Sequence, residues 1–384
     1  MAEEVTYLAS FSGEIGTKRA GTQKALKELT LENLSARAEV LGLSLKVEEF
    51  RGRLKISSSQ REVERLLLTH FGLGRVAPYF RITPEFDWQA LLPARPFTFE
   101  IYVDRWQSPE LKQEALALKR RLLSLFEAEA EKRLTLWDNH PPAHLRLFLE
   151  AWEEGIFLLK DPQPAAGGFP VGSGGRVLLL FSGGPDSLLA AWLLLRRGLE
   201  VTLLFFDDEE EGRAELVELA ARKLAFFIPR GEMLLVHHPF RKHLLELKDS
   251  VPERERCFYC KSLMLEIGRD LLPKVPAGAL ATGEILGEQA SQTLPALQFI
   301  NFGKDLVLRP VLAFTKEEVF GKLTEVGLEK IATRRLPACP FAPERPRTAP
   351  RKDPSKAAKI LRKLARIPAR PAFKILKYRR EDED

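Results

Sequence analysis

Two glycines and a short polar run separate an apolar strand from an apolar helix in LLLFSGGPDSLLAAWLLLRRG, residues 178–198. A strand that enters a helix through a glycine-rich turn leaves unpaired backbone N–H groups at the helix N-terminus, where the helix dipole is positive. Gly183 and Gly184 let this backbone approach an anion closely, because they have no Cβ. Ser182 and Ser187 add hydroxyl donors. The pattern predicts a phosphate-binding loop.

Asp186 has the wrong charge for an anion site, and its presence is explained if it holds a Mg²⁺ ion that bridges phosphates. An ordinary strand-to-helix turn needs only one capping Ser or Asp. The loop is not a Walker sequence, since no Gly-Lys-Ser/Thr closes it, and it is not the dinucleotide fingerprint. It resembles the PP-loop, Ser-Gly-Gly-x-Asp-Ser, of the ATP pyrophosphatases. This resemblance implies that ATP is split between its α- and β-phosphates and that an oxygen is adenylated.

The three cysteines suggest a second kind of chemistry. Cys257 and Cys260 lie in RCFYCK, and Cys339 lies in LPACPFAP. A CxxC pair can be a redox pair, half of a zinc site or part of a cluster site, and cysteines can also be small hydrophobic residues or form a reversible disulfide. No histidine lies beside either segment, which disfavours a closed zinc site. Three thiolates would bind three irons of a 4Fe–4S cluster and leave one iron open for hydrosulfide. We therefore expect these cysteines to be catalytic and to ligate an iron–sulfur cluster.

Composition limits the classes of protein. The 384 residues suffice for two or three domains. No apolar run reaches the ~18 residues of a membrane span, and the start, MAEEVTYLAS, is acidic, so we expect a soluble protein with no membrane partner. The few cysteines favour a reducing, cytoplasmic setting. The net charge is +6, and residues 351–380 contain Asp353 as their single acid, which favours a polyanionic partner.

Strand and helix patterns divide the chain. The first sixty residues predict a β-α-β unit that ends in two strands joined at Arg51-Gly52. A second unit follows, with a strand over residues 97–106, a helix after the N-cap Ser108, and a hairpin that turns at residues 153–155. Residues 161–175, DPQPAAGGFPVGSGG, are typical of a linker.

Beyond the linker, short apolar runs alternate with helical patterns. The runs RVLLLF, EVTLLFF, EMLLVHH and AGALATG suit strands that are covered on both faces. The fold class expected is therefore multidomain α/β, with a C-terminal doubly wound parallel sheet. Ligands of such sheets bind at the carboxyl ends of adjacent strands.

Several segments together resemble one family. They are FSGEIGTKR (11–19), GGFPVGSGGRVLLLFSGGPDS, ATGEILGEQASQTL (281–294), LVLRPVLAFTKEEV and CPFAPERPRT. In that order they resemble the tRNA 4-thiouridine synthetases of the ThiI type, over roughly residues 5–348. The resemblance implies an N-terminal ferredoxin-like domain, a THUMP RNA-binding domain, a PP-loop catalytic domain and a basic C-terminal tail, over residues 1–60, 61–165, 166–348 and 349–384.

The resemblance also implies an ATP site, with Lys261 as a cation for the α-phosphate. The stretch Phe205-Phe206-Asp207-Asp208 departs from the family, which usually has a histidine there. The implied nucleotide contacts are Leu180, Phe181, Ser182, Gly183, Gly184, Asp186, Ser187, Phe205, Phe206, Lys261, Gly283 and Gln292.

The activity implied is thiolation of tRNA uridine to 4-thiouridine, at position 8, by adenylation of the C4 oxygen and sulfur transfer. Some members carry a C-terminal rhodanese domain. We expect none here, so the sulfur donor would be free sulfide or a cysteine desulfurase. The family also implies a homodimer. Basic residues expected to contact RNA are Lys18, Arg19, Arg51, Arg53 and Arg75.

Three alternatives stay open at this point. A related PP-loop thiolase would modify another tRNA nucleotide. An ATP-dependent amide-forming synthetase would explain the loop but not the cysteines. A non-catalytic RNA-binding protein would have a relic ATP fold, which the intact loop disfavours.

Overall fold

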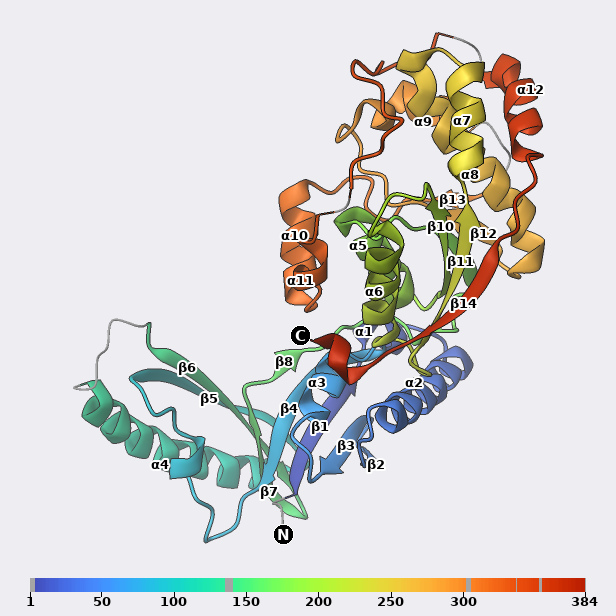
Figure 1. Ribbon diagram of the computed structural model, residues 1–384. Coiled ribbons are helices and arrows are strands. Elements are labelled where there is room, and N and C mark those ends of the chain that lie inside the picture. The colour runs from blue at the N-terminus through green and yellow to red at the C-terminus, as the bar shows by residue number, and fades with distance from the viewer. Residues whose placement is uncertain (1–3, 135–140, 302–304, 336, 352–353, 384) are drawn as a thin grey trace. The chain divides into compact units, whose positions relative to one another are not determined.

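The computed structural model describes residues 4–134, 141–301, 305–335, 337–351 and 354–383 (Figure 1). The chain forms two compact units. Unit 1 comprises residues 1–27 and 41–168, and unit 2 comprises residues 28–40 and 169–384. None of the described helices has an apolar stretch long enough to span a bilayer.

Unit 1 is built on one mixed sheet with the strand order β2-β3-β1-β4-β7-β6-β5, and β8 pairs with β4. The strands are β1 (Val5–Phe11), β2 (Lys46–Phe50), β3 (Arg53–Ser58), β4 (Leu73–Arg81), β5 (Phe97–Trp106), β6 (Ala143–Trp152), β7 (Gly155–Lys160) and β8 (Gln163–Pro164). The helices are α1 (Gly13–Gly16), α2 (Ala20–Val40), whose last residues belong to unit 2, α3 (Val63–Leu68), η1 (Gln89–Leu91) and α4 (Pro109–Leu134).

Strand β4 connects the two halves of this sheet. Its nine residues are enough to pair with β1 along the first part and with β7 along the second, where Tyr79 faces Leu159. The two segments that the sequence analysis separates at residue 60 therefore share a sheet. Both expected hairpins are confirmed, since Phe50 faces Arg53 and Trp152 faces Gly155.

Unit 2 has a six-stranded sheet with the order β13-β12-β9-β10-β11-β14. All pairs from β13 to β11 are parallel, which confirms the expected fold class. The strands are β9 (Arg176–Leu180), β10 (Glu200–Asp207), β11 (Glu232–Pro239), β12 (Ala279–Ala281), β13 (Val307–Leu308) and β14 (Ala372–Lys377). The helices are α5 (Pro185–Arg196), α6 (Arg213–Ala225), α7 (Arg241–Ser250), η2 (Glu253–Glu255), α8 (Arg256–Leu271), η3 (Leu272–Lys274), η4 (Ala290–Gln292), α9 (Leu294–Ile300), α10 (Lys316–Glu325), α11 (Glu329–Ala332), α12 (Pro354–Ala365) and η5 (Arg380–Glu383).

The C-terminal segment, which the sequence analysis sets apart as a basic tail, contributes to unit 2. Ala357, Leu361 and Leu364 of α12 follow helical spacing, and they are buried in the core that α7 and α8 also form (Figure 1). Strand β14 then pairs antiparallel with β11, where Phe373 faces Val236. The segment is therefore amphipathic, with an apolar side that completes the core.

The strand order creates a switch point beside β9. From β9 the chain adds β10 and then β11 on one side, and it later places β12 on the other side of β9. The loops that leave β9 and β12 therefore diverge, and a crevice opens between them at the carboxyl ends of these strands. Ligands of open α/β sheets bind in such crevices.

Candidate nucleotide and thiol site

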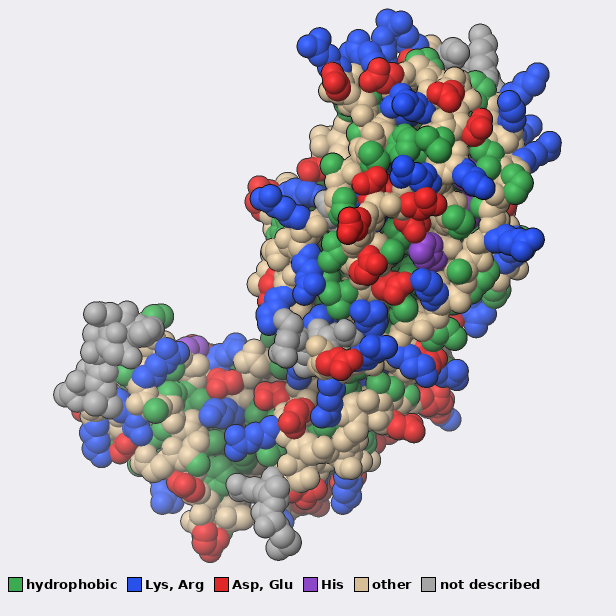
Figure 2. All heavy atoms as spheres, in the orientation of Figure 1, with side chains coloured by type: hydrophobic (Ala, Val, Ile, Leu, Met, Phe, Trp, Pro, Cys, Tyr) green, Lys and Arg blue, Asp and Glu red, His purple; other side chains and the backbone are tan. Residues whose placement is uncertain are grey.

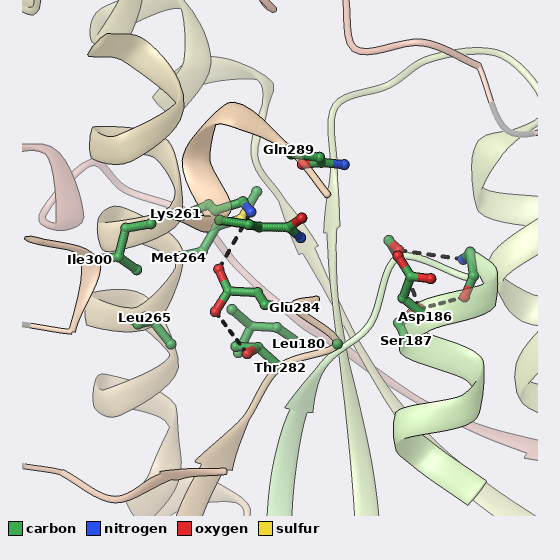
Figure 3. Close-up of a pocket in the computed structure, with 14 residues that line it drawn as sticks. Leu180, Asp186, Ser187, Lys261, Met264, Leu265, Thr282, Glu284, Gln289 and Ile300 are labelled. Atoms are coloured by element: carbon green, nitrogen blue, oxygen red, sulfur yellow. Dashed lines mark hydrogen bonds and ion pairs between the residues drawn. The ribbon is translucent and has the colours of Figure 1, made fainter. Parts of the chain in front are cut away.

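A pocket lies at this switch point, with a volume of about 270 Å³, near the lower end of the range for small-ligand sites. The phosphate loop forms one wall, and α8 with the loop after β12 forms the other (Figure 3). The lining residues are Leu180, Ser182, Gly184, Asp186, Ser187, Lys261, Met264, Leu265, Thr282, Gly283, Glu284, Gln289, Gln292 and Ile300.

The phosphate loop is held in place by its own side chains. Gly184 is the N-cap of α5, and Pro185 occupies the first helical turn, where its missing N–H costs nothing. The Ser187 hydroxyl donates to the Gly184 carbonyl at 3.0 Å and lies 3.2 Å from the Ser182 hydroxyl. Gly183 has φ +76°, which favours glycine. The open end of α5 thus presents backbone N–H groups toward the pocket, as an anion site requires.

Gly283 is required because two loops approach very closely. A Cβ at this position would lie 2.7 Å from both the backbone nitrogen and the Cα of Ser187. Real Cβ atoms do not tolerate such contacts with backbone, so any side chain would push the loop after β12 away from α5. Gly283 therefore sets the width of the pocket between its two walls.

The carboxylate of Asp186 forms an ion pair across the pocket edge. Both of its oxygens accept hydrogen bonds from the Lys316 ammonium group, at 2.7 and 2.8 Å, and Lys316 also lies 3.6 Å from Glu288. The expected position of Asp186 in the loop is thus accompanied by a cation that the sequence analysis missed.

The sequence around Lys316 contains a pattern that could have indicated its anionic partner. Thr315 and Glu318 form a capping box, which starts α10 at Lys316. A lysine in the first turn of a helix faces the positive end of the helix dipole, which is unfavourable unless an anion compensates it. The anion is Asp186.

Lys261 is held by a buried carboxylate. Glu284 is 6 % exposed, and its Oε1 lies 3.4 Å from the Lys261 ammonium group. Its Oε2 accepts hydrogen bonds from the Arg309 guanidinium at 2.9 Å and from the Thr282 hydroxyl at 3.0 Å. Glu284 thus fixes the cation expected to meet the α-phosphate, and the sequence analysis did not identify this role.

Gln292 offers an open acceptor. Its side chain is 4 % exposed and lines the pocket, yet its Oε1 atom has no hydrogen-bond partner among the described residues. A buried amide oxygen without a partner is costly, so this atom marks a place where a ligand N–H would be stabilised.

Four expected contacts lie outside the lining of this pocket. Phe181 is buried, and at Gly183 a Cβ would lie 3.0 Å from a side-chain atom of Val217. Phe205 and Phe206 lie within β10, where they pack beside His237 and His238. Phe206 also belongs to the hydrophobic core, because alternate residues of a doubly covered strand point into one of two buried layers.

Two of the three cysteines lie one helical turn away from the pocket wall. Cys257 and Cys260 are half-buried in the first turns of α8, and each precedes a lining residue, Lys261 or Met264, by four positions. Cys339 is exposed, and all three are free of disulfides.

Burial controls the charge state of the two helical thiols. Burial raises the pKa of Cys260, and the nearby charges of Cys339 and Cys257 raise it further. Burial also raises the pKa of Cys257, against which Lys261 acts to lower it. The three sulfurs are therefore neighbours that influence one another's charge, and the helical pair favours the neutral thiol.

The three cysteines match an iron–sulfur cluster in number and in ligand type. In the described segments, however, no group of three His, Cys, Asp or Glu has a metal-binding arrangement. A bound metal stabilises thiolates, which opposes the effect of burial on these pKa values. Asp186 likewise fits Mg²⁺, because each of its oxygens keeps a lone pair beyond the one that Lys316 occupies.

Unit 1 contradicts one expected RNA contact. Arg53 is buried and forms a bidentate ion pair with Glu150, with N–O distances of 2.6 and 2.7 Å. A buried guanidinium requires such a partner, so Arg53 is not available to a phosphate. Arg51 is exposed, but it pairs with Glu154 and stacks on Trp152. Arg75 is exposed.

The sequence of this chain matches a known family. Residues 172–364 match the family described as thiamine biosynthesis protein (ThiI). A probable tRNA sulfurtransferase of Bacillus licheniformis is 34% identical over 227 residues, which cover 57% of this chain and 55% of the relative. One from Methanocaldococcus jannaschii is 26% identical over 373 residues, 92% of this chain and 95% of the relative. The chain thus spans about half the length of the Bacillus relative.

Solved structures agree with the fold. The chain is similar to a 4-thiouridine synthetase, whose crystal structure contains RNA and bound ATP. The TM-score is 0.74 at 25% identity, over 98% of this chain and 100% of that one. PH1313 from Pyrococcus horikoshii shares the fold, with a TM-score of 0.56 at 16% identity over 84% of this chain and 100% of that one.

Proposed function

The chain belongs to the ThiI family, and from this membership we propose that it is a tRNA sulfurtransferase that converts uridine to 4-thiouridine, at position 8. The observation that supports the proposal is a pocket that lies between a phosphate loop and a helix that bears two cysteines. A PP-loop with its open helix N-terminus forms one side, and the helix that bears the CxxC pair forms the other. ATP activation and sulfur delivery would then meet at one base.

ATP would bind with its phosphates at the loop. The N–H groups at the start of α5 and the hydroxyls of Ser182 and Ser187 would hold the β- and γ-phosphates, and Lys261 would approach the α-phosphate. The open Gln292 oxygen would accept from an N–H group of the adenine or the uracil. The ATP in the similar synthetase structure supports this assignment.

The proposed reaction has two steps. The C4 oxygen of uracil attacks the α-phosphorus, pyrophosphate leaves, and the N3 proton is released to solvent. Hydrosulfide then attacks C4, the C4–O bond breaks, and AMP departs with the former base oxygen. The proton of the hydrosulfide moves to N3, which gives the neutral 4-thiouracil.

Charge neutralisation would fall to residues of this chain. Lys316 and Lys261 place two cations at opposite sides of the pocket, so both ends of the triphosphate would be compensated. Asp186 would hold Mg²⁺, which neutralises phosphate charge when it is bound. Glu284 keeps Lys261 in place, and α8 excludes water with Met264 and Leu265.

The sulfur would be handled by Cys257, Cys260 and Cys339 as ligands of an iron–sulfur cluster, with the 4Fe–4S form favoured. Such a cluster supplies, when bound, an open iron that can carry sulfide. The sulfur donor would be free sulfide or a cysteine desulfurase. Three unpaired cysteines agree with a cytoplasmic location.

The polyanionic partner would be tRNA. Unit 1 would contribute the THUMP surface, and α12 would add exposed Lys359, Arg362 and Lys363 opposite its buried side. Figure 2 shows Lys and Arg side chains along the side of unit 2 on which α12 lies. We also propose a homodimer, as the family implies, and light scattering of the purified chain tests it.

The function is tested by anaerobic reconstitution with iron and sulfide, followed by ATP and unmodified tRNA. Nucleoside mass spectrometry should find 4-thiouridine only when ATP is present. Mass mapping of nuclease fragments then locates the modified nucleotide. Thiolation away from position 8 would overturn the position, and absence of any thionucleoside from iron-loaded protein would overturn the activity.

A further inference from the structure

The segment that carries Cys339 has little structure of its own. Residues 337–351 contain no helix or strand, and Cys339 is exposed within it. Its position relative to the CxxC helix must therefore come from contacts with other parts of unit 2. Several of those contacts are hydrogen bonds from arginine side chains, and Phe341 also packs against the core of unit 2.

Arg213 holds the residues just before Cys339. It lies at the start of α6, and its Nη2 donates to the Pro337 carbonyl at 2.7 Å and to the Ala338 carbonyl at 3.3 Å. Its Nε forms a 2.8 Å ion pair with Asp208, which follows β10 and is 7 % exposed. Arg213 thus connects the residues just before Cys339 to the carboxyl end of β10.

Arg256 holds the residues just after Cys339. It immediately precedes Cys257 at the start of α8, and its Nη1 donates to the Phe341 carbonyl at 2.9 Å. Arg254, two residues before Arg256, makes two more bonds to this segment. Its side chain donates to the Arg345 carbonyl, and its own carbonyl accepts from the Arg347 N–H, each at 2.9 Å. The start of α8 is therefore bonded to the Cys339 segment at several points.

Arginine suits this role for a chemical reason. Backbone carbonyls of an irregular segment lack the acceptor pairing that a helix or sheet provides, and a guanidinium offers five donors in a rigid fork. One arginine can bind two successive carbonyls and a carboxylate together, as Arg213 does. A lysine could not reproduce this geometry with one ammonium group.

We propose that Arg213 and Arg256 are positioning residues of the thiol site, which bracket Cys339 and hold it against Cys257 and Cys260. The role of that site in sulfur transfer rests on the proposed function, whereas the bracketing rests on the contacts above. Neither arginine lines the nucleotide pocket.

The proposal is tested with dibromobimane, which becomes fluorescent after it alkylates two neighbouring thiols. The reduced, iron-free full-length chain is treated, and peptide mass mapping identifies links between Cys339 and the CxxC pair. We expect these links to form at least ~10-fold more slowly in Arg213→Met and Arg256→Met, because the effective concentration of Cys339 near its partners falls. Arg213→Lys and Arg256→Lys should recover only part of the rate.

Arg241→Met is the matched control. Arg241 also donates to a backbone carbonyl, that of Asp208, but among the described residues it forms no hydrogen bond or ion pair with residues 337–351. Its cross-linking rate should equal that of the unsubstituted chain. If a methionine variant does not fold, the lysine variants, which keep the charge, decide the question.

Equal rates in all variants, or no link to Cys339 in the unsubstituted chain, would overturn the proposal. As a second readout, iron bound after anaerobic reconstitution should fall in both methionine variants. Cross-linking needs no ATP, tRNA or iron, so its outcome is independent of the proposed function. A chain that fails to thiolate tRNA but shows arginine-dependent cross-linking would refute the function and leave the bracketing intact.

Discussion

The phosphate loop and the thiol site lie in the same unit, but they are built in different ways. The loop is one continuous stretch between β9 and α5, and its serines and glycines fix it through contacts within a few residues. The thiol site joins the start of α8 to a segment far along the chain, and arginines hold that segment by its carbonyls. A site made from one turn is defined locally, whereas a site made from two segments depends on tertiary contacts.

The phosphate loop and the thiol site also differ in whether their electrostatic surroundings favour the charged species that each would bind or form. The loop presents the N-terminus of a helix to an arriving anion, and Lys316 already offsets the negative charge of Asp186 beside it. The helical thiols have raised pKa values because of burial, so they favour the neutral form until a metal or a ligand changes their surroundings.

The largest effect on activity is expected from Asp186, and it should affect the phosphate loop without affecting the thiol site. Asp186→Asn should lower tRNA-dependent AMP formation by about 10³-fold, because the carboxylate that would hold Mg²⁺ at the phosphates and that orients Lys316 is lost. The rate of thiol cross-linking should not change. An assay with radiolabelled ATP measures AMP formation, and dibromobimane fluorescence measures the rate of thiol cross-linking. Near-normal AMP formation in this variant would remove Asp186 from the mechanism.

Lys316 gives the next largest effect. Lys316→Met should lower AMP formation by roughly 10²-fold, since it removes a cation and leaves Asp186 uncompensated. Lys316→Arg should retain more activity because it keeps the charge. Equal activity in the methionine and arginine variants would show that charge at this position does not matter.

Gly283 tests whether the pocket width depends on close backbone approach. Gly283→Ala should lower the free energy of unfolding by about 3 kcal/mol and weaken ATP binding, because its Cβ would overlap the Ser187 backbone. Gly321→Ala is the control, since a Cβ there meets nothing within 4 Å and the site lies in α10. Chemical denaturation and calorimetry measure both variants. Equal stability of the two would mean that the loops do not meet as described.

The smallest effect concerns alkaline pH. The pKa of Cys260 is raised in the folded state, so above the unfolded thiol value, about 8.5, only the unfolded chain releases this proton. The metal-free protein should therefore lose about 1.4 kcal/mol of stability per pH unit from this thiol. Cys260→Ser should have a shallower decline. An identical slope in denaturation curves between pH 8 and 10 would contradict the effect of burial on Cys260.

The features that the sequence predicts best are those that depend on residues close together in the chain. The loop from Ser182 to Ser187 could be predicted because Gly, Ser and Asp have distinct backbone and hydrogen-bonding roles in a strand-to-helix turn. The parallel sheet followed from apolar runs that suit strands covered on both faces. Gly283 and Lys261 were predicted from the family resemblance alone. The approach of Gly283 to Ser187 and the pairing of Lys261 with Glu284 are tertiary contacts, which local sequence patterns do not show.

Other features could not be obtained from local patterns. Arg53 looks like any basic residue in a strand, and only the position of Glu150 on a neighbouring element explains why it is buried. Phe205 and Phe206 end an apolar run, but the strand is long enough to keep both in the sheet. The basic segment after residue 350 contains a helix with a buried apolar side and a strand that pairs with β11. Its charge alone therefore did not predict that it packs into unit 2.

The claim that joins the two regions is that the base oxygen is adenylated before sulfur attacks C4, so that this oxygen departs in AMP. tRNA with ¹⁸O at C4 of the target uridine tests this directly, with AMP, pyrophosphate and water examined by mass spectrometry after one turnover. The account predicts the label in the phosphate of AMP, in an amount equal to the 4-thiouridine formed. Label in water or in pyrophosphate would contradict it.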